Sequence, residues 1–204
     1  MVGIFEKGKA DVRFTARSNG GHASAPPKNT PIARLSAFVT HVEKHSPFKK
    51  RISPQVAAMF KTLAPYAPFG MKLLFGNIWL FRPLLKAALP AVSAQAGAML
   101  KTTVAFTMQS GSDACNVIPQ EATLAVNMRF IPHQGEKESL AIMRRLAEKY
   151  GLEMDILHAN DYTEPVDIHG SGYKTVEAVI EKTFPGLASS PYVMTGATDA
   201  QFYQ

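Results

Sequence analysis

The 204-residue sequence predicts an α+β protein, a ferredoxin-like two-layer sandwich in which two helices cover a four-stranded antiparallel sheet. Three observations support this fold. Four segments alternate apolar and polar residues, as half-buried strands do, and two others repeat apolar residues at helical spacing. They occur in the order strand, helix, strand, strand, helix, strand. Placing both helices on one face of the sheet is the simplest way to bury every apolar face in that order.

The first strand and helix are expected over residues 11–17 and 30–42. The strand alternates strictly. The helix begins with Thr30, placed to cap it, and with Pro31, whose fixed φ suits the first turn. Its apolar residues then recur at helical spacing.

The second half of the sandwich follows a long interruption. Residues 102–109 and 122–130 alternate like strands, with the turn-rich segment 110–113 between them. The second helix is expected over residues 136–149, ended by Gly151 as a C-terminal cap, and residues 152–157 form the last strand. An open sheet of this kind has an edge that pairing with a second copy would cover, so we expect a homodimer.

The interruption, residues 46–98, lies in the most basic part of the chain. From Lys44 to Ser112 there is no Asp or Glu, whereas nine of the 22 Lys and Arg residues lie there. The other 13 basic residues are outnumbered by the 16 acidic ones. The net charge of +6 therefore belongs to one segment and does not by itself indicate a nucleic-acid-binding fold.

This insertion is also aromatic and rich in proline. Prolines at such spacing predict only short helices with kinks or turns between them: Pro54, Pro65, Pro68, Pro83 and Pro90. Basic, aromatic, short helices suit an anionic membrane surface or an apolar entrance to a binding cleft. They also suit an insertion that packs against its own domain with its lysines solvated, and this third interpretation is favoured over the other two.

The character of the chain changes after residue 157. Residues 162–167 are typical of a linker, residues 172–184 of a helix, and residues 191–196 of a strand that leads to a Thr-Gly turn. One helix and one strand cannot close a core. Residues 158–204 are therefore interpreted as the incomplete start of an α/β domain that follows a domain spanning residues 1–157.

Three polar residues stand out as candidates for binding a substrate. Gly20 and Gly21 can present His22 at a turn, and Asn116 and Arg129 flank a short strand where both could meet an anion. Each has a simpler interpretation. His22 could be an ordinary turn residue, and the Asn116 side chain could hydrogen-bond to the backbone of its own turn. Arg129 could pair with Glu121 on the surface.

Four motifs in order carry a family resemblance. They are Gly-His-Ala-Ser-Ala-Pro at residues 21–26, Asn-Val-Ile-Pro-Gln-Glu-Ala at 116–122, Val-Asn-Met-Arg-Phe at 126–130 and Thr-Gly-Ala-Thr-Asp-Ala at 195–200. Together they resemble the co-catalytic zinc peptidases, which include glutamate carboxypeptidase, acetylornithine deacetylase, succinyl-diaminopimelate desuccinylase and aminoacylase. The residues of the first motif and the presence of the long insertion most resemble the carboxypeptidase S and N-acyl-amino-acid hydrolase branch.

The resemblance implies a metal-dependent hydrolase in which this chain supplies a dimerising lid and the start of the returning catalytic half. By the same resemblance, His22 reaches across the dimer and donates to the oxyanion of the reaction. Asn116, Arg129, Thr195 and Gly196 bind the substrate, a peptide or N-acyl amino acid, and Arg129 grips its free carboxylate. Two zinc ions are expected in the full-length enzyme.

The metal-binding residues of that family are missing from this sequence. No His is followed at the second position by Asp, and no two Glu residues are adjacent. Zinc hydrolases need several ligands and a base for the bound water, so we expect this chain alone to bind no metal and to be inactive. Ala197 and Gln201 also depart from the usual Gly and Arg of the last motif.

Two other functional classes remain open. The chain could be a noncatalytic dimerisation module, or a ferredoxin-like RNA-binding domain that stacks bases on Phe14, Phe106 and Phe130. The RNA interpretation is disfavoured because the positive charge lies on the insertion and not along the strands. Residues 1–7 lack the pattern of a signal peptide, which favours a cytoplasmic location.

Overall fold

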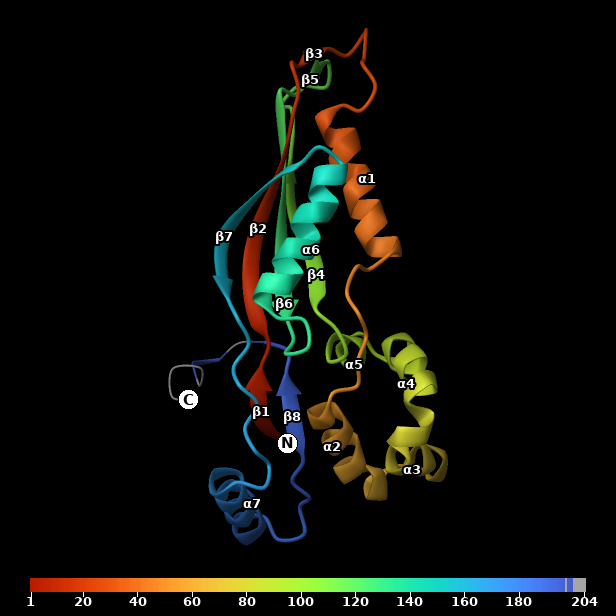
Figure 1. The fold of residues 1–204 in the computed structure, drawn as a ribbon, viewed down its shortest axis with the longest axis vertical. Helices are drawn as coiled ribbons and strands as arrows, with labels where there is room; N and C mark the ends of the chain where they lie inside the picture. Colours follow the sequence, from red (N-terminus) through yellow and green to blue (C-terminus); the bar gives the residue numbers. More distant parts are fainter. Residues whose placement is uncertain (197, 200–204) are drawn as a thin grey trace.

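The computed structural model describes residues 1–196, 198 and 199, and it shows an elongated molecule with two hydrophobic cores (Figure 1). One core lies under a long antiparallel sheet. The other lies beside a short parallel strand pair near the N-terminus, where the helices of the insertion gather (Figure 1).

The long sheet has the predicted ferredoxin-like architecture. Its strand order is β4-β6-β2-β7, with every neighbouring pair antiparallel. The strands are β2 (Gly8–Arg17), β4 (Thr103–Ser110), β6 (Glu121–Phe130) and β7 (Glu153–Asn160). Helices α1 (Pro31–Lys44) and α6 (Glu136–Lys149) both cover one face (Figure 1). The α+β class, the element order and the extent of α6 are therefore confirmed.

Alternation along the two central strands determines which face is buried. The apolar residues of β2 and β6 point toward the helices and form the first core, which includes Val12, Phe14, Leu124, Val126, Met128 and Phe130. The intervening residues, such as Arg13 and Asn127, lie on the opposite face, which has no helix over it. Phe106 of β4 also packs on the helix side, against Phe38 of α1.

The C-terminal cap of α6 matches the sequence prediction, whereas the N-terminal cap of α1 does not. Gly151 has φ +62°, and the N–H groups of Gly151 and Leu152 bond back to the carbonyls of Glu148 and Ala147. This is a Schellman motif, so the predicted cap of α6 is confirmed. Pro31 occupies the first turn of α1, but within the described part of the chain the Thr30 hydroxyl makes no capping hydrogen bond, and that expectation is wrong.

The second core joins both ends of the chain to the insertion. β1 (Val2–Glu6) pairs in parallel with β8 (Pro191–Met194), and α7 (Ser171–Thr183) packs nearby through Tyr173. The insertion forms α2 (Pro54–Leu63), a 3₁₀ helix (Ala64–Tyr66), α3 (Phe69–Gly76), α4 (Ile78–Val92) and α5 (Ala94–Ala98). The buried side chains of these helices pack with those of β1 and β8, whereas Phe48, at the start of the insertion, packs in the first core.

The prolines of the insertion do not all end helices. Pro54 begins α2 and Pro68 precedes α3, as expected of a residue without an N–H. Pro83 and Pro90, however, lie inside α4, which still runs for 15 residues, so the prediction of only short helices is wrong there. α5 packs closely on the end of α4, where a Cβ on Gly97 would lie 3.1 Å from Pro90.

The two cores meet where the chain enters and leaves the long sheet. A Cβ added at Gly8 would lie 2.6 Å from the backbone of Asp161 and Tyr162, so the incoming and outgoing segments touch through their main chains. Only glycine permits this approach without displacement of one segment. We call this junction, from Glu6 to Lys9 together with the facing ends of β4, β6 and β8, the hinge end of the sheet.

Candidate substrate-binding site

The predicted site residues divide between the two ends of the long sheet. His22 and Asn116 lie at the end where β3 (Gly21–His22) pairs with β5 (Val117–Ile118), which we call the tip (Figure 1). Arg129 lies near the other end of β6, paired with Lys9 of β2 and Thr103 of β4. It therefore belongs to the hinge end.

The tip holds His22 in one ring orientation. Gly20 and Gly21 have φ +68° and +155°, conformations that favour glycine, and they turn the chain so that His22 is exposed. Nδ1 of His22 lies 3.2 Å from the Ser24 backbone N–H and 2.8 Å from the Ser24 hydroxyl. Because the backbone N–H can only donate, Nδ1 accepts, and the ring proton of the neutral imidazole is on Nε2.

Asn116 is bound to the same loop through its main chain. Its carbonyl accepts a hydrogen bond of 2.9 Å from the N–H of Ala23, and the next residue, Val117, pairs with His22. The Asn116 side chain is exposed. The tip thus presents an imidazole N–H and a side-chain amide from one small two-stranded ribbon.

At the hinge end, Arg129 is half-buried and only partly hydrogen-bonded. Its Nε donates to Oδ1 of Asn127 at 3.0 Å, and Asn127 in turn donates to Asp11 at 2.7 Å. Its Nη1 is buried and has no hydrogen-bond partner among the described residues. The simpler pairing with Glu121 is wrong, because that carboxylate pairs with Arg17 at the other end of the strand.

A buried lysine adds positive charge beside Arg129. Lys7 is 2% exposed, and its Nζ donates to the carbonyls of Ala98 at 3.0 Å and Lys101 at 2.9 Å. Burial, together with the nearby charges of Arg129 and Lys101, lowers the pKa of Lys7 to about 7. None of its partners in the described chain is a carboxylate.

The end of β8 approaches this charged cluster. The N–H of Lys7 donates to the carbonyl of Met194 at 3.1 Å, so Thr195 and Gly196 follow immediately beside the hinge end. Further along, the Thr198 N–H donates to the buried Glu6 carboxylate at 2.8 Å. Residues 197 and 200–201 of the predicted motif, including Ala197 and Gln201, lie outside the described residues.

The tip and the hinge end are too far apart to share a small anion within one chain. Between Glu121 and Arg129, β6 advances eight residues, which is about 26 Å at the usual strand rise. The prediction that Asn116 and Arg129 flank a short strand and meet one anion is therefore wrong for a single chain. β6 is instead a strand of ten residues, Glu121–Phe130, that runs between the two ends of the sheet.

The comparisons with known proteins agree with this architecture. The model of the M20 peptidase dimerisation domain matches residues 4–155, about three quarters of the chain. The chain belongs to this family. The description of the family implies that these domains form dimers.

Relatives of this dimerisation domain are longer proteins. The chain is 31% identical over its whole length to N-fatty-acyl-amino acid synthase/hydrolase PM20D1 of Xenopus tropicalis, of which it covers 40%. It is 26% identical to the probable carboxypeptidase S-like 2 of Dictyostelium discoideum, with 99% of the chain and 38% of that protein covered. The chain thus spans about two fifths of the length of these relatives.

Solved structures show the same fold at low sequence identity. Aminopeptidase PepT of Bacillus cereus superposes with a TM-score of 0.57 at 14% identity, over 97% of this chain and 41% of that one. A hydantoinase/carbamoylase family amidase of Burkholderia vietnamiensis gives 0.55 at 14% identity, over 98% and 38%. The fold of the dimerisation domain is therefore shared with hydrolases of different names.

The residues of this dimerisation domain do not fit a metal centre. Among residues 1–196, 198 and 199, no three His, Cys, Asp or Glu side chains gather closely enough to hold an ion. The two zinc ions of the full-length enzyme stay a prediction.

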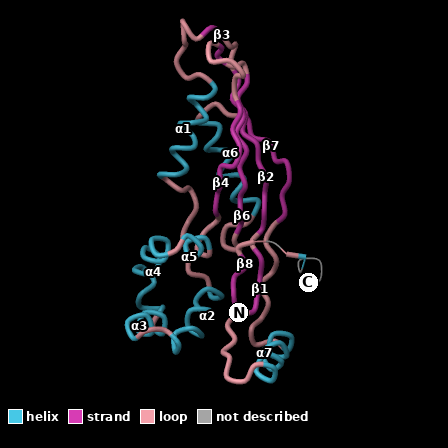
Figure 2. Tube along the Cα trace, turned by 180° about the vertical axis from the view of Figure 1, so that it is seen from behind, coloured by secondary structure: helices cyan, strands magenta, loops and turns pink. Residues whose placement is uncertain are grey.

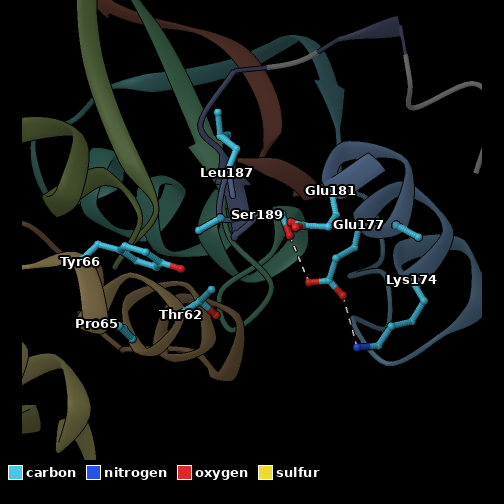
Figure 3. Close-up of a pocket in the computed structure, with 10 residues that line it drawn as sticks. Thr62, Pro65, Tyr66, Lys174, Glu177, Glu181, Leu187 and Ser189 are labelled. Atoms are coloured by element: carbon cyan, nitrogen blue, oxygen red, sulfur yellow. Dashed lines mark hydrogen bonds and ion pairs between the residues drawn. The ribbon is translucent and has the colours of Figure 1, made fainter. Parts of the chain in front are cut away.

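The chain also has an open cavity of about 560 Å³ between the insertion and α7. Figure 3 shows three of its polar groups paired: Glu177 accepts from Lys174 at 3.4 Å and from Ser189 at 3.1 Å. None of the predicted site residues lines it. We assign it no function.

Sequence reasoning missed two members of the hinge end. Lys7 gives no motif, and only its tertiary contacts distinguish it from a surface lysine. Asn127 could have been found, because it lies two residues before Arg129 and side chains at that spacing share a face of a strand.

Burial of Lys7 predicts a pH dependence of stability. The unfolded lysine keeps its proton up to about pH 10.5, whereas the folded one loses it near pH 7, so the unfolded state binds more protons between these values. Stability should rise with pH from 7 to 10.5, by at most about 1.4 kcal/mol per pH unit from this group. Urea unfolding across this range should show that slope, and Lys7→Met should remove it.

The control for this experiment is Lys137→Met, which removes an exposed lysine from the first turn of α6. That variant should keep the slope of the unmodified chain. A Lys7→Met variant that also keeps it would show that Lys7 is not the group responsible.

Proposed function

We propose that this chain is the dimerising lid of a metal-dependent amidohydrolase that acts on the amide bond of N-acyl amino acids or of peptides with a free terminal carboxylate. The observation that carries the proposal is the division of polar groups between a positively charged hinge end and an exposed tip that presents hydrogen-bond donors. The names of the relatives, a fatty-acyl-amino acid synthase/hydrolase and a probable carboxypeptidase, support a substrate with a carboxylate next to the amide.

In this proposal Arg129 binds the carboxylate of the substrate. Its guanidinium is held at Nε by Asn127, while the buried Nη1 still lacks a partner within the described residues. A planar guanidinium that is fixed on one side can donate two parallel hydrogen bonds to a carboxylate on the other. Lys7 strengthens the positive potential there when it is protonated.

His22 and Asn116 act in the active site of the partner subunit. Glu121 lies about 26 Å from Arg129 along β6, and the tip lies beyond Glu121, so one substrate cannot contact both ends of the same lid. A second copy can bring its tip to the first copy's substrate. There the Nε2–H of His22 donates to the oxygen of the amide carbonyl as negative charge develops on it, and the Asn116 amide helps to orient the substrate.

Thr195 and Gly196 lie on the Arg129 side of the proposed substrate site. No heavy atom lies within 4 Å of where a Cβ of Gly196 would be, among the described residues, so a substrate can approach its main chain closely. These residues follow β8 directly at the hinge end. Their proposed role is to position the substrate.

The bond to be broken is the amide C–N bond, and water supplies the OH and H that the two products gain. Activation of that water belongs to the metal-binding part of the full-length enzyme, since the described residues of this chain do not fit a metal. The lid alone is expected to bind substrates weakly and to hydrolyse none.

The test uses the full-length enzyme that contains this chain. It should release free amino acid from N-acyl amino acids or C-terminal dipeptides, and a chelator should abolish the release. The matched control substrate has its carboxylate converted to an amide, and its kcat/KM should be lower by about 10²-fold or more, because Arg129 then faces a neutral group. Equal cleavage of both substrates, or activity that survives chelation, would contradict the proposal.

The two alternative functions make different predictions. A noncatalytic dimerisation module would dimerise but show no turnover in the full-length protein. An RNA-binding domain would need aromatic rings on the open face of the sheet, whereas Phe14 and Phe130 are buried under the helices and Phe106 packs there too. That arrangement favours the hydrolase proposal.

A further inference from the structure

Helix α4 of the insertion is apolar on two opposite sides. Ile78, Leu85 and Leu89 are buried in the second core. At about 100° per residue, Leu80 and Leu84 lie on the opposite side of the helix, where they are 56% and 53% exposed. A helix that is apolar on nearly all sides is usually covered on all of them. Contact with the second core therefore accounts for the apolar residues on only one side of α4.

The exposed apolar residues continue onto the neighbouring elements. Five large side chains within 16 residues of sequence are more than half exposed, and we call them the insertion surface: Phe69, Leu73, Trp79, Leu80 and Leu84. Single exposed apolar residues are common on proteins, but a concentration of this kind marks an interaction surface.

The charge of the segment restricts what can cover this surface. Between Ser53 and Ala98 the sequence has four cations and no acidic residue, and the cations are Lys61, Lys72, Arg82 and Lys86. A second copy would bring the same charges and be repelled. A surface that carries negative charge and an apolar interior satisfies both the cations and the apolar side chains.

The insertion surface is also placed away from the rest of the lid. α2 lies between the β1–β8 pair and helices α3 and α4, in both views of the molecule (Figures 1 and 2). α4 is thus on the outer side of the second core, and the tip with His22 lies at the far end of the molecule (Figure 1). Docking through α4 leaves the tip accessible.

A small cavity next to the insertion surface is lined, like that surface, by apolar and cationic residues. It holds about 230 Å³ between α2, α3 and α4, and Phe75 and Ile78 contribute apolar walls. Lys61, Trp79 and Arg82 also line it, all of them exposed. Two cations beside an aromatic ring suit a lipid phosphate whose chain enters the apolar region.

We propose that the insertion surface docks on anionic lipid membranes, with its apolar side chains in the headgroup region and its cations against lipid phosphates. The docking is interfacial, since no helix in the described chain has the length and hydropathy needed to cross a bilayer. It goes beyond the proposed hydrolase activity. It would place the lid where substrates with long acyl chains are dissolved.

Flotation of the full-length enzyme with vesicles tests this proposal. The enzyme should float with vesicles of phosphatidylcholine and phosphatidylserine, and much less with phosphatidylcholine alone. The double variant Leu80→Gln/Leu84→Gln and the triple variant Lys72→Glu/Arg82→Glu/Lys86→Glu should each lower the partition coefficient by roughly tenfold or more. Their hydrolysis of a soluble, short-chain substrate should not change, which separates this test from that of the proposed function.

The matched control is Val179→Gln/Lys182→Glu on α7, which removes an apolar residue 57% exposed and a nearby cation. It should float like the unmodified enzyme. Equal flotation of all variants, or no preference for anionic vesicles, would overturn the proposal. Three results for Leu80→Gln/Leu84→Gln would also overturn it if flotation is unchanged: a lower thermal midpoint of unfolding, a change of oligomeric state, or a raised KM for substrates with long acyl chains. These results would assign the surface to the rest of the enzyme, to a second copy or to the substrate's acyl chain, respectively.

Discussion

Replacing His22 with alanine in the full-length enzyme is expected to lower kcat by about 10²–10³-fold, the usual cost of removing one donor to a developing oxyanion. KM should change little, because the donor acts mainly in the transition state. Steady-state kinetics on an N-acyl amino acid measures both. The control is His45→Ala, an exposed histidine just after α1 that is far from the tip along that helix, and it should retain full activity.

A mixed dimer decides whether His22 acts across the subunit interface. One subunit carries His22→Ala and the other Arg129→Ala, with different affinity tags for purification. If the tip serves the partner's site, one of the two sites contains both an intact Arg129 and an intact His22. The mixed dimer should then recover about half of the unmodified activity, while each variant homodimer is nearly inactive. No recovery would show that His22 and Arg129 of one subunit serve the same site, which the length of β6 makes impossible without a different sheet arrangement.

Replacing Arg129 with alanine is expected to lower kcat/KM for substrates with a free carboxylate by about 10²–10³-fold, the usual cost of removing one partner of a desolvated charge pair. The effect should fall mainly on KM, since the carboxylate is bound in both the ground state and the transition state. The measurement is the ratio of kcat/KM for the acid and for its amide, which should collapse toward one in the variant.

Arg13 supplies the matched control for this experiment. It lies on the same open face of the sheet, but it is half exposed and pairs with Asp155 at 3.2 Å. Exposed pairs contribute little, so Arg13→Ala should keep the preference for the acid. Arg129→Lys should recover only part of it, because an ammonium lacks the planar fork. If Arg129→Ala keeps the full preference, another group binds the carboxylate.

The elements of the sandwich followed from local patterns. β2 and β6 alternate strictly, so one face of each had to be buried, and α6 could be delimited to the residue because Gly151 adopts the positive φ that ends it. The insertion and the tail were recognised through proline spacing and charge. The candidate residues His22, Asn116 and Arg129 came from motifs, and each motif identified a residue but not its position in the fold.

The sequence by itself determined which segments are strands and helices and which residues carry unusual chemistry, because alternation, capping and glycine turns are properties of neighbouring residues. Only the tertiary structure decided how these parts are grouped. It put Asn116 and Arg129 at opposite ends of β6, buried Lys7 beneath carbonyls more than 90 residues away, and packed the insertion on β1 and β8. Such relations depend on strand pairing and on desolvation by distant segments, and neither leaves a periodic signal in the chain.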